Sequence, residues 1–225
     1  MSFTPLNTLK SHLNAIDAQG LRRVRRSVES ECQPHLVVDG KPLLAFNSND
    51  YLGLAAHPLV IEALKEGASL YGAGSGASHL ISGHSLAHER LEELLASMLS
   101  PYLPNVRVLS FSTGYMANLG VLSALADSAK GDITFFSDAL NHASLIDGIR
   151  LTRSPCEVYR HADVADLSQR LSSCQSTSKV VVTDGVFSMD GDIAPLQDLL
   201  RLCEQHGAWL LVDDAHGFGV LGDTG

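Results

Sequence analysis

The sequence predicts an α/β protein with a mostly parallel sheet and helices on both faces of that sheet. From about residue 106 onward, short apolar segments of strand length alternate with longer segments whose apolar residues recur at helical spacing. Such alternation is typical of a doubly wound parallel sheet. Polar or glycine-containing segments follow the predicted strands, at the sheet edge where ligands bind in this fold class. The fold class therefore also predicts where a site should lie.

Length and composition exclude several classes of protein. The 225 residues suffice for one large domain or two small ones, and 45% apolar content is enough for a normal core. A net charge of −9 argues against a general nucleic-acid binder. Neither an apolar run of membrane-spanning length nor the apolar core of a signal peptide is present. The scattered cysteines indicate reduced thiols in a cytoplasmic protein: Cys32, Cys156, Cys174 and Cys203.

The first part of the chain is less regular than the rest. We expect an N-terminal portion, residues 1–50, and a large domain over residues 51–225. The expected elements are a helix over residues 1–30, two short strands over 36–46, a helix over 58–71, a glycine-rich loop over 72–83 and a helix over 86–99. Asp39-Gly40 is a turn sequence between the two strands. Gly72 is placed to cap the helix that precedes it.

Strand and helix candidates then alternate to the end of the chain. The predicted strands cover residues 106–111, 133–136, 179–183 and 208–212. The predicted helices cover residues 116–128, 141–151, 163–173 and 195–206. Each strand is a short apolar run, as expected for strands that are buried on both faces.

Residues that could bind a ligand or take part in a reaction follow each predicted strand. After the four strands come, in order, Ser112 and Thr113 with the backbone of Gly114 and Tyr115, then His142, then Asp184 and Ser188, then Asp213 and His216. The first group opens a helix, whose unpaired N–H groups bind phosphate. The His142 ring could stack on a planar ligand, although a lone histidine is more often structural. Together these residues suit a phosphorylated heteroaromatic cofactor, and pyridoxal 5′-phosphate (PLP) fits best.

A metal-dependent hydrolase is the competing interpretation of the same residues. It would use Asp213, Asp214 and His216 together with His142. Their spacing matches no common ligand motif, so we expect no metal.

Five motifs resemble the α-oxoamine synthases, in the same order and over nearly the whole chain. They are Asn49-Asp50-Tyr51-Leu52-Gly53-Leu54, Gly74-Ser75-Gly76 with Ile81-Ser82-Gly83-His84-Ser85, Asn141-His142-Ala143-Ser144, the run from Gly185 to Asp192, and Asp213-Asp214-Ala215-His216-Gly217. These enzymes condense an amino acid with an acyl-CoA and release carbon dioxide. The resemblance implies the large domain of a fold type I PLP-dependent transferase, similar to aspartate aminotransferase, and a homodimer.

The resemblance also implies a role for each matching residue. Asp213 would pair with the pyridinium nitrogen of PLP, and His142 would stack on the ring. Ser188 and His216 would bond the phenolic oxygen, and Gly114 and Tyr115 would lie beside the phosphate. Arg22 would meet the substrate carboxylate, with Arg23, Arg25 and Arg26 as neighbouring alternatives. Asp184 stands where the family commonly has glutamate. The expected catalytic residues are His142, Asp213 and His216, and His142 would also contact substrate.

Within the family, the run from Ser82 to His88 is most similar to the member that joins L-alanine to pimeloyl-CoA or pimeloyl-carrier protein. Sister synthases that make 2-amino-3-oxobutyrate or 5-aminolevulinate remain alternatives, as does an inactive binding module. The family's Schiff-base lysine lies in a Thr-x-x-Lys segment beyond the Asp-x-Ala-His motif. None of the lysines present matches that segment: Lys10, Lys41, Lys65, Lys130 and Lys179. We therefore expect the N-terminal part of a longer enzyme, inactive by itself.

Overall fold

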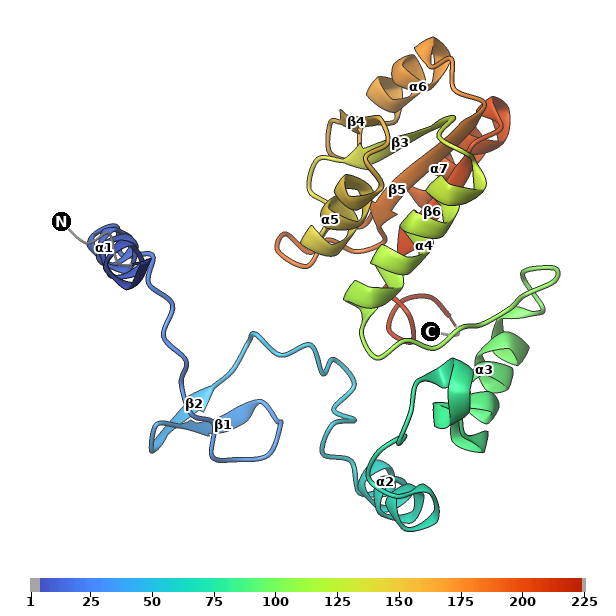
Figure 1. The fold of residues 1–225 in the computed structure, drawn as a ribbon. Helices are drawn as coiled ribbons and strands as arrows, with labels where there is room; N and C mark the ends of the chain where they lie inside the picture. Colours follow the sequence, from blue (N-terminus) through green and yellow to red (C-terminus); the bar gives the residue numbers. More distant parts are fainter. Residues whose placement is uncertain (1–4, 224–225) are drawn as a thin grey trace. The chain divides into compact units, whose positions relative to one another are not determined.

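The computed structural model describes residues 5–223 of the chain (Figure 1). The chain divides into two compact units, Met1–Lys65 and Glu66–Gly225. The domain boundary expected after residue 50 stays a prediction, since compactness alone does not test which part folds independently. Every helix among residues 5–223 is too short or too polar to span a lipid bilayer.

Helix α1 spans Pro5–Ala18 and is shorter than predicted. The expectation of a helix through residue 30 is wrong, because the chain leaves the helix at a turn in which Gly20 has φ of 68°. Beyond it, Arg22, Arg25 and Arg26 would stand three and four residues apart on a helix. Like charges at that spacing destabilise a helix.

The predicted pair of short strands is confirmed. Strands β1 (His35–Val38) and β2 (Lys41–Leu44) form an antiparallel hairpin. The two residues between them, Asp39 and Gly40, have φ of 49° and 71°. Positive φ at both central residues is the geometry of the tight hairpin turn that Asp-Gly favours.

Helices α2 (Pro58–Tyr71) and α3 (Leu86–Leu99) have the predicted bounds. Gly72 ends α2 with φ of 82°, and its N–H donates to the carbonyl of Ala68 at 2.9 Å. The glycines predict an irregular loop between the two helices, and this prediction is only partly right. The segment contains one wide helical turn, η1, over His79–Gly83.

The second unit contains a four-stranded parallel sheet. Its strands are β3 (Ile133–Asp138), β4 (Cys156–Tyr159), β5 (Ser178–Asp184) and β6 (Trp209–Asp213), in the order β4-β3-β5-β6. Strands β3, β5 and β6 match predicted strands. Strand β4 was not predicted, because its Cys-Glu-Val-Tyr sequence is short and mixed in polarity, as an edge strand allows.

The strand expected over residues 106–111 is wrong. This segment has no regular structure and pairs with no strand within residues 5–223. Its apolar side chains Leu109 and Phe111 are exposed. A strand is stable only when a neighbour satisfies its backbone and covers its side chains, so alternation in sequence is not sufficient.

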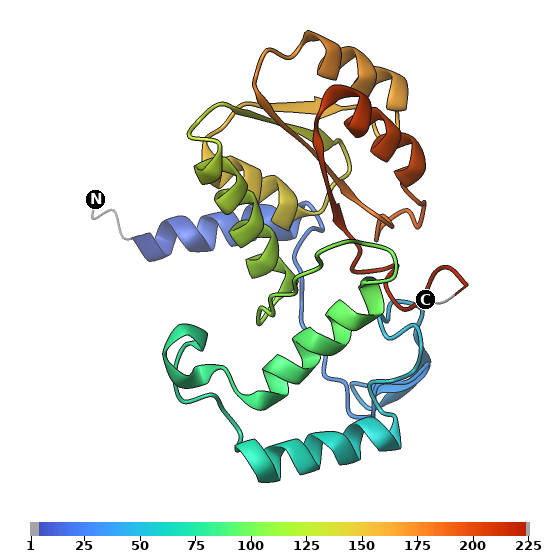
Figure 2. The ribbon, with the colours of Figure 1, turned by 90° about the vertical axis from the view of Figure 1, so that its right-hand side faces the viewer.

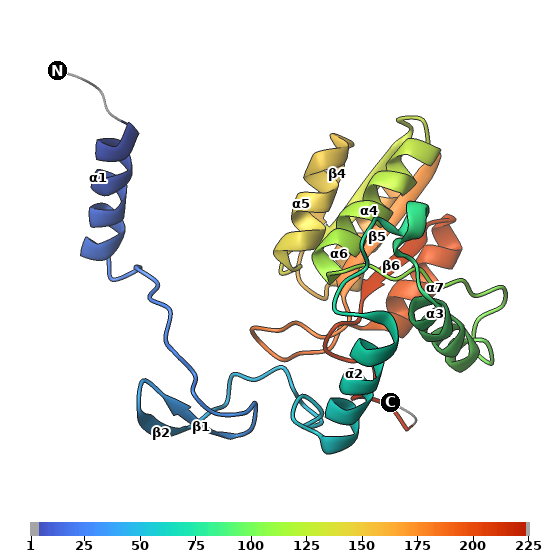
Figure 3. The ribbon, with the colours of Figure 1, turned by 60° about the horizontal axis from the view of Figure 1, so that its bottom comes forward.

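Helices cover both faces of the sheet (Figures 2 and 3). Helices α4 (Gly114–Ser128) and α5 (Ala143–Thr152) lie on one face, and α6 (Val164–Ser173) and α7 (Leu196–His206) lie on the other. Alternate residues of the strands point to the two faces, so the core forms two clusters. One cluster contains Leu122, Leu145 and Phe135, and the other contains Leu167, Leu199 and Phe136. The predicted α/β fold, with helices on both faces, is confirmed.

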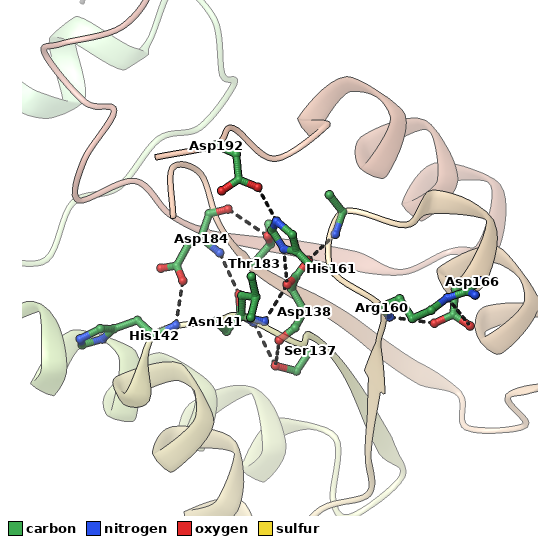
Figure 4. A network of polar contacts seen from close by, with 12 residues as sticks. Ser137, Asp138, Asn141, His142, Arg160, His161, Asp166, Thr183, Asp184 and Asp192 are labelled. Carbon is green, nitrogen blue, oxygen red and sulfur yellow. Dashed lines mark hydrogen bonds and ion pairs between the residues drawn. The ribbon is translucent and has the colours of Figure 1, made fainter. Parts of the chain in front are cut away.

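His161 joins the loops that follow three strands (Figure 4). Its Nδ1 lies 2.9 Å from Oδ1 of Asp138 at the end of β3, and its Nε2 bonds Oδ2 of Asp192 in the loop after β5. Both ring nitrogens donate only when the imidazole is charged. Burial lowers the pKa of His161, but hydrogen bonds to Asp192 and Asp138 outweigh it and raise the pKa overall. This contact holds the loop that carries Ser188.

The contact between α4 and α5 depends on Gly148. A Cβ atom there would lie 2.6 Å from Cδ1 of Leu122, which is fully buried, and 3.3 Å from the carbonyl of Asn118. We expect Gly148→Ala to destabilise the protein by about 1–3 kcal/mol through overpacking, although alanine favours helix. Urea unfolding measures the change. Gly120→Ala in α4 is the control, because its Cβ would make only an ordinary contact of 3.4 Å with Phe111. Equal stability of the two variants would contradict this packing.

The His161 contacts predict a pH-dependent contribution to stability. A raised histidine pKa stabilises the fold fully below its unfolded value of about 6.5, and the effect is lost as pH rises through the raised value. The hydrogen bond from His161 lowers the pKa of Asp192, whose contribution is lost as pH falls through that lowered value. His161→Gln should therefore lower the melting temperature more at about pH 6 than at about pH 9. His12→Gln, at an exposed position of α1, is the control. An equal loss of melting temperature at both pH values would contradict a charged His161 imidazole.

Candidate functional site

A pocket of about 160 Å³ opens where β5 and β6 end and where α4 and α5 begin. Its walls bring together seven residues that the sequence singled out, from segments far apart in the chain. The lining residues are Gly114, Tyr115, His142, Ser144, Asp184, Ser188, Asp213, Ala215 and His216. Arg22, the expected substrate-binding residue, belongs to the first unit, where its guanidinium lies 3.1 Å from Oδ2 of Asp17.

The N-terminus of α4 forms one wall of the pocket. Thr113 caps the helix, and its Oγ1 accepts from the backbone N–H of Met116 at 3.1 Å. Gly114 and Tyr115 are the first helical residues, so their N–H groups have no carbonyl partner within the helix. No atom lies within 4 Å of where a Cβ of Gly114 would be. The predicted helix N-terminus is thus present, although no strand precedes it, and its role in binding an anion stays a prediction.

The His142 ring stands at the N-terminus of α5 and borders the pocket. Its Nδ1 accepts from the backbone N–H of Ser144 at 3.2 Å and lies 2.7 Å from the Ser144 hydroxyl. Its backbone N–H donates to Oδ2 of Asp184 at 2.7 Å (Figure 4). The hydrogen bond to Nδ1 leaves the proton of the neutral ring on Nε2. Ring and backbone are therefore both held in place.

Asp213 ends β6, and hydrogen bonds orient its carboxylate. Oδ2 accepts from the side-chain amide of Asn118 at 2.7 Å, and Oδ1 accepts from the backbone N–H of Ala215 at 3.1 Å. The Asn118 amide also donates to the hydroxyl of Ser144 at 2.9 Å. Sequence reasoning missed Asn118. The available signal was a polar residue one helical turn after Gly114, on the same face of an otherwise apolar helix.

Asp184 lies beside Asp213 in the sheet but faces different partners. The two are paired residues of β5 and β6. Asp184 is 7% exposed, and its backbone N–H donates to Oδ1 of Asn141 at 3.0 Å. Burial raises the pKa of Asp184 and the charge of Asp213 adds to this, whereas the hydrogen bond from His142 lowers it. Two neighbouring carboxylates make this end of the pocket suitable for a cationic group.

Ser188 and His216 line the rest of the pocket from loops after β5 and β6. Asp214 is not among the lining residues, because its carboxylate packs against the two loops. A Cβ at Gly217 would lie 2.2 Å from Oδ1 of Asp214, and one at Gly185 would lie 2.9 Å from the same atom. Of the two adjacent acids, Asp213 is therefore the one that lines the pocket.

The hydrolase interpretation finds no support in the described residues. Asp213, Asp214, His216 and His142 do not form a group with three ligand atoms near one ion over residues 5–223. No lysine lines the pocket in that part of the chain either.

Relatives of this chain share its sequence and its fold. Curated proteins named 8-amino-7-oxononanoate synthase are 63% identical over 220 residues in Bordetella petrii and 61% identical over 217 residues in a Janthinobacterium species. They cover 98% and 96% of this chain, which spans 55% and 54% of their lengths. The chain thus spans about half the length of the curated relatives it matches. Their names confirm the resemblance that the five motifs indicate.

Solved structures of related enzymes have the same fold as this chain. Serine palmitoyltransferase of Sphingomonas wittichii has a TM-score of 0.85 at 33% identity, over 99% of this chain and 55% of that one. The Francisella tularensis 8-amino-7-oxononanoate synthase has a TM-score of 0.61 at 34% identity, over 79% of this chain and 46% of that one. A third structure, a serine palmitoyltransferase with PLP, has a TM-score of 0.78. They confirm the predicted fold type I class.

The family model for aminotransferase class I and II matches residues 41–225, which include the sheet, its helices and the whole pocket. The chain belongs to the aminotransferase class I and II family.

Proposed function

We propose that this chain is part of a PLP-dependent 8-amino-7-oxononanoate synthase. The enzyme would condense L-alanine with pimeloyl-CoA or pimeloyl-carrier protein and release carbon dioxide. Relatives at up to 63% identity carry this name. The observation that carries the proposal is the Asp213 carboxylate, held by Asn118 at the pocket wall, with the His142 ring and the α4 N-terminus on other walls.

The pocket residues fit PLP in three respects. The N–H groups of Gly114 and Tyr115 suit its phosphate, because a helix N-terminus attracts anions. The His142 ring is fixed by Ser144 in an orientation that can cover a flat heterocycle. Asp213 supplies a fixed negative charge for a protonated ring nitrogen.

When bound, PLP supplies an electron sink for the carbanion that forms from an amino acid. The pocket residues of this chain would set the protonation of the PLP ring and shield the ring from water. Asp213 would keep a proton on the ring nitrogen, and Asn118 fixes the acceptor oxygen of Asp213. His142 would cover one face of the ring and exclude water. Ser188 and His216 would donate to the phenolic oxygen.

Other parts of the proposal come from the resemblance and from composition. Arg22 would bind the substrate carboxylate, a role that suits a bidentate guanidinium, and His142 would contact substrate. The protein would be a homodimer in the cytoplasm, with the glycine-rich loop 72–83 crossing between subunits. The lysine that holds PLP covalently would lie in a part of the protein outside this chain.

The choice of amino acid tests the proposed function. A protein that carries this chain at the full length of its relatives should release carbon dioxide from L-alanine and pimeloyl thioester. Glycine, which lacks one methyl group, should react at least about tenfold more slowly in kcat/KM. Product formation by mass spectrometry and radiolabelled carbon dioxide measure both rates. Preference for glycine with a shorter acyl thioester would instead identify a sister synthase.

Replacing Asp213 tests the assignment of the cofactor acid. Asp213→Asn keeps the shape but removes the charge, so the ring nitrogen should lose its proton and its power as an electron sink. Turnover should fall by about 100-fold or more, while PLP occupancy, read from visible absorbance, falls much less. Asp214→Asn is the matched control, because that side chain does not line the pocket. Normal turnover of Asp213→Asn at full occupancy would rule out this role.

A further inference from the structure

A second group of chemically active side chains lies outside the PLP pocket. His79 begins η1, His84 follows η1 directly, and His88 lies in the first turn of α3. One ligand nitrogen from each ring lies within 4.8 Å of the other two. We propose that these three histidines bind a divalent metal ion of the zinc class.

The local backbone brings the first two rings together. The N–H of Gly83 donates to the carbonyl of Ser78 at 2.9 Å, which closes a wide turn of five residues. A Cβ on Gly83 would lie 1.9 Å from the carbonyl oxygen of Ala77, so this turn requires glycine. The turn therefore places His79 and His84, five residues apart, side by side. Their ring centroids are 5.2 Å apart.

The distance between these two rings suits a shared cation. Nδ1 of His79 lies 3.2 Å from Nδ1 of His84. Two unprotonated nitrogens at this distance repel each other, so a proton or a metal ion must lie between them. Nitrogens bound to one tetrahedral zinc ion at about 2.0–2.1 Å are about 3.3 Å apart. The observed separation is therefore close to that of a zinc site.

His88 completes the group from α3. Its Nδ1 lies 2.9 Å from Oγ of Ser85 and 3.1 Å from the backbone N–H of Ser85. Metal binding at Nε2 would move the ring proton to Nδ1, where Oγ of Ser85 accepts it. The bond from the Ser85 N–H would be given up. Ligating histidines commonly donate their second N–H to such an acceptor, which fixes the ring.

The carboxylate of Glu92 adds a negative charge that favours a cation at the histidine group. Glu92 lies one helical turn after His88, and its Oε1 accepts from the Ser110 hydroxyl at 2.6 Å. The two hydrogen bonds from Ser110 lower the pKa of Glu92 and so favour its ionised form. Three imidazoles match the preference of zinc for nitrogen ligands and leave a fourth position for water.

Zinc titration of the chain tests the site. Isothermal titration calorimetry should show one equivalent of Zn²⁺ bound, and Co²⁺ in its place should give the strong visible absorption of a tetrahedral ion. His79→Gln and His84→Gln should each weaken binding by about 100-fold, and Ser85→Ala by about tenfold. His12→Gln and His57→Gln, at exposed positions outside the group, are the controls and should bind as the parent chain does.

Two results would overturn the proposal. One is absence of binding at millimolar Zn²⁺, which would leave a shared proton between His79 and His84 as the explanation of their contact. The other is binding that is unchanged in His79→Gln and His84→Gln, which would locate the ion elsewhere. Both positions are exposed, so folding should survive the changes, and circular dichroism checks it. PLP need not be bound, so the outcome is independent of the proposed enzymatic function.

Discussion

The parallel pairing of β5 with β6 places Asp184 directly beside Asp213, and the site depends on this register. Both acids end their strands at the same edge of the sheet, where a buried negative charge is costly unless it has hydrogen-bond donors. The Asn118 amide serves one acid, and the His142 backbone serves the other. A register shift of one residue in β6 would turn Asp213 to the opposite face and separate it from its donors.

The same two acids orient the helices that build the pocket. Asp213 holds Asn118 of α4, and Asp184 holds the first turn of α5 through His142. Ser144 contacts both Asn118 and His142, so it connects the Asp213 carboxylate, through Asn118, to the His142 ring. The small pocket is therefore not a gap left by packing. It is bounded by groups whose positions are fixed by their contacts with one another, which is what preorganised binding of a charged, planar molecule requires.

Local sequence signals predicted most of the regular elements for identifiable reasons. The tight turn at Asp39-Gly40 and the helix end at Gly72 were predictable, because each depends on the backbone conformation that these residues themselves favour. Segment 106–111 was wrongly predicted as a strand and strand β4 was missed, because strand formation depends on a partner. The first segment is apolar but has no partner among the described residues, whereas the second is mixed in polarity but pairs with β3.

The sequence by itself determined which residues were available at the ends of the strands, because apolar runs followed by acids, histidines and glycines are local patterns. Only the tertiary structure decided which of them meet. Asn118 and Asp213 lie 95 residues apart and form a hydrogen bond, and Asp214, adjacent to Asp213, packs against glycines instead. Such choices depend on helix–sheet packing and strand register, which act through space. A pattern along the chain cannot specify them, since each depends on partners that only folding brings close.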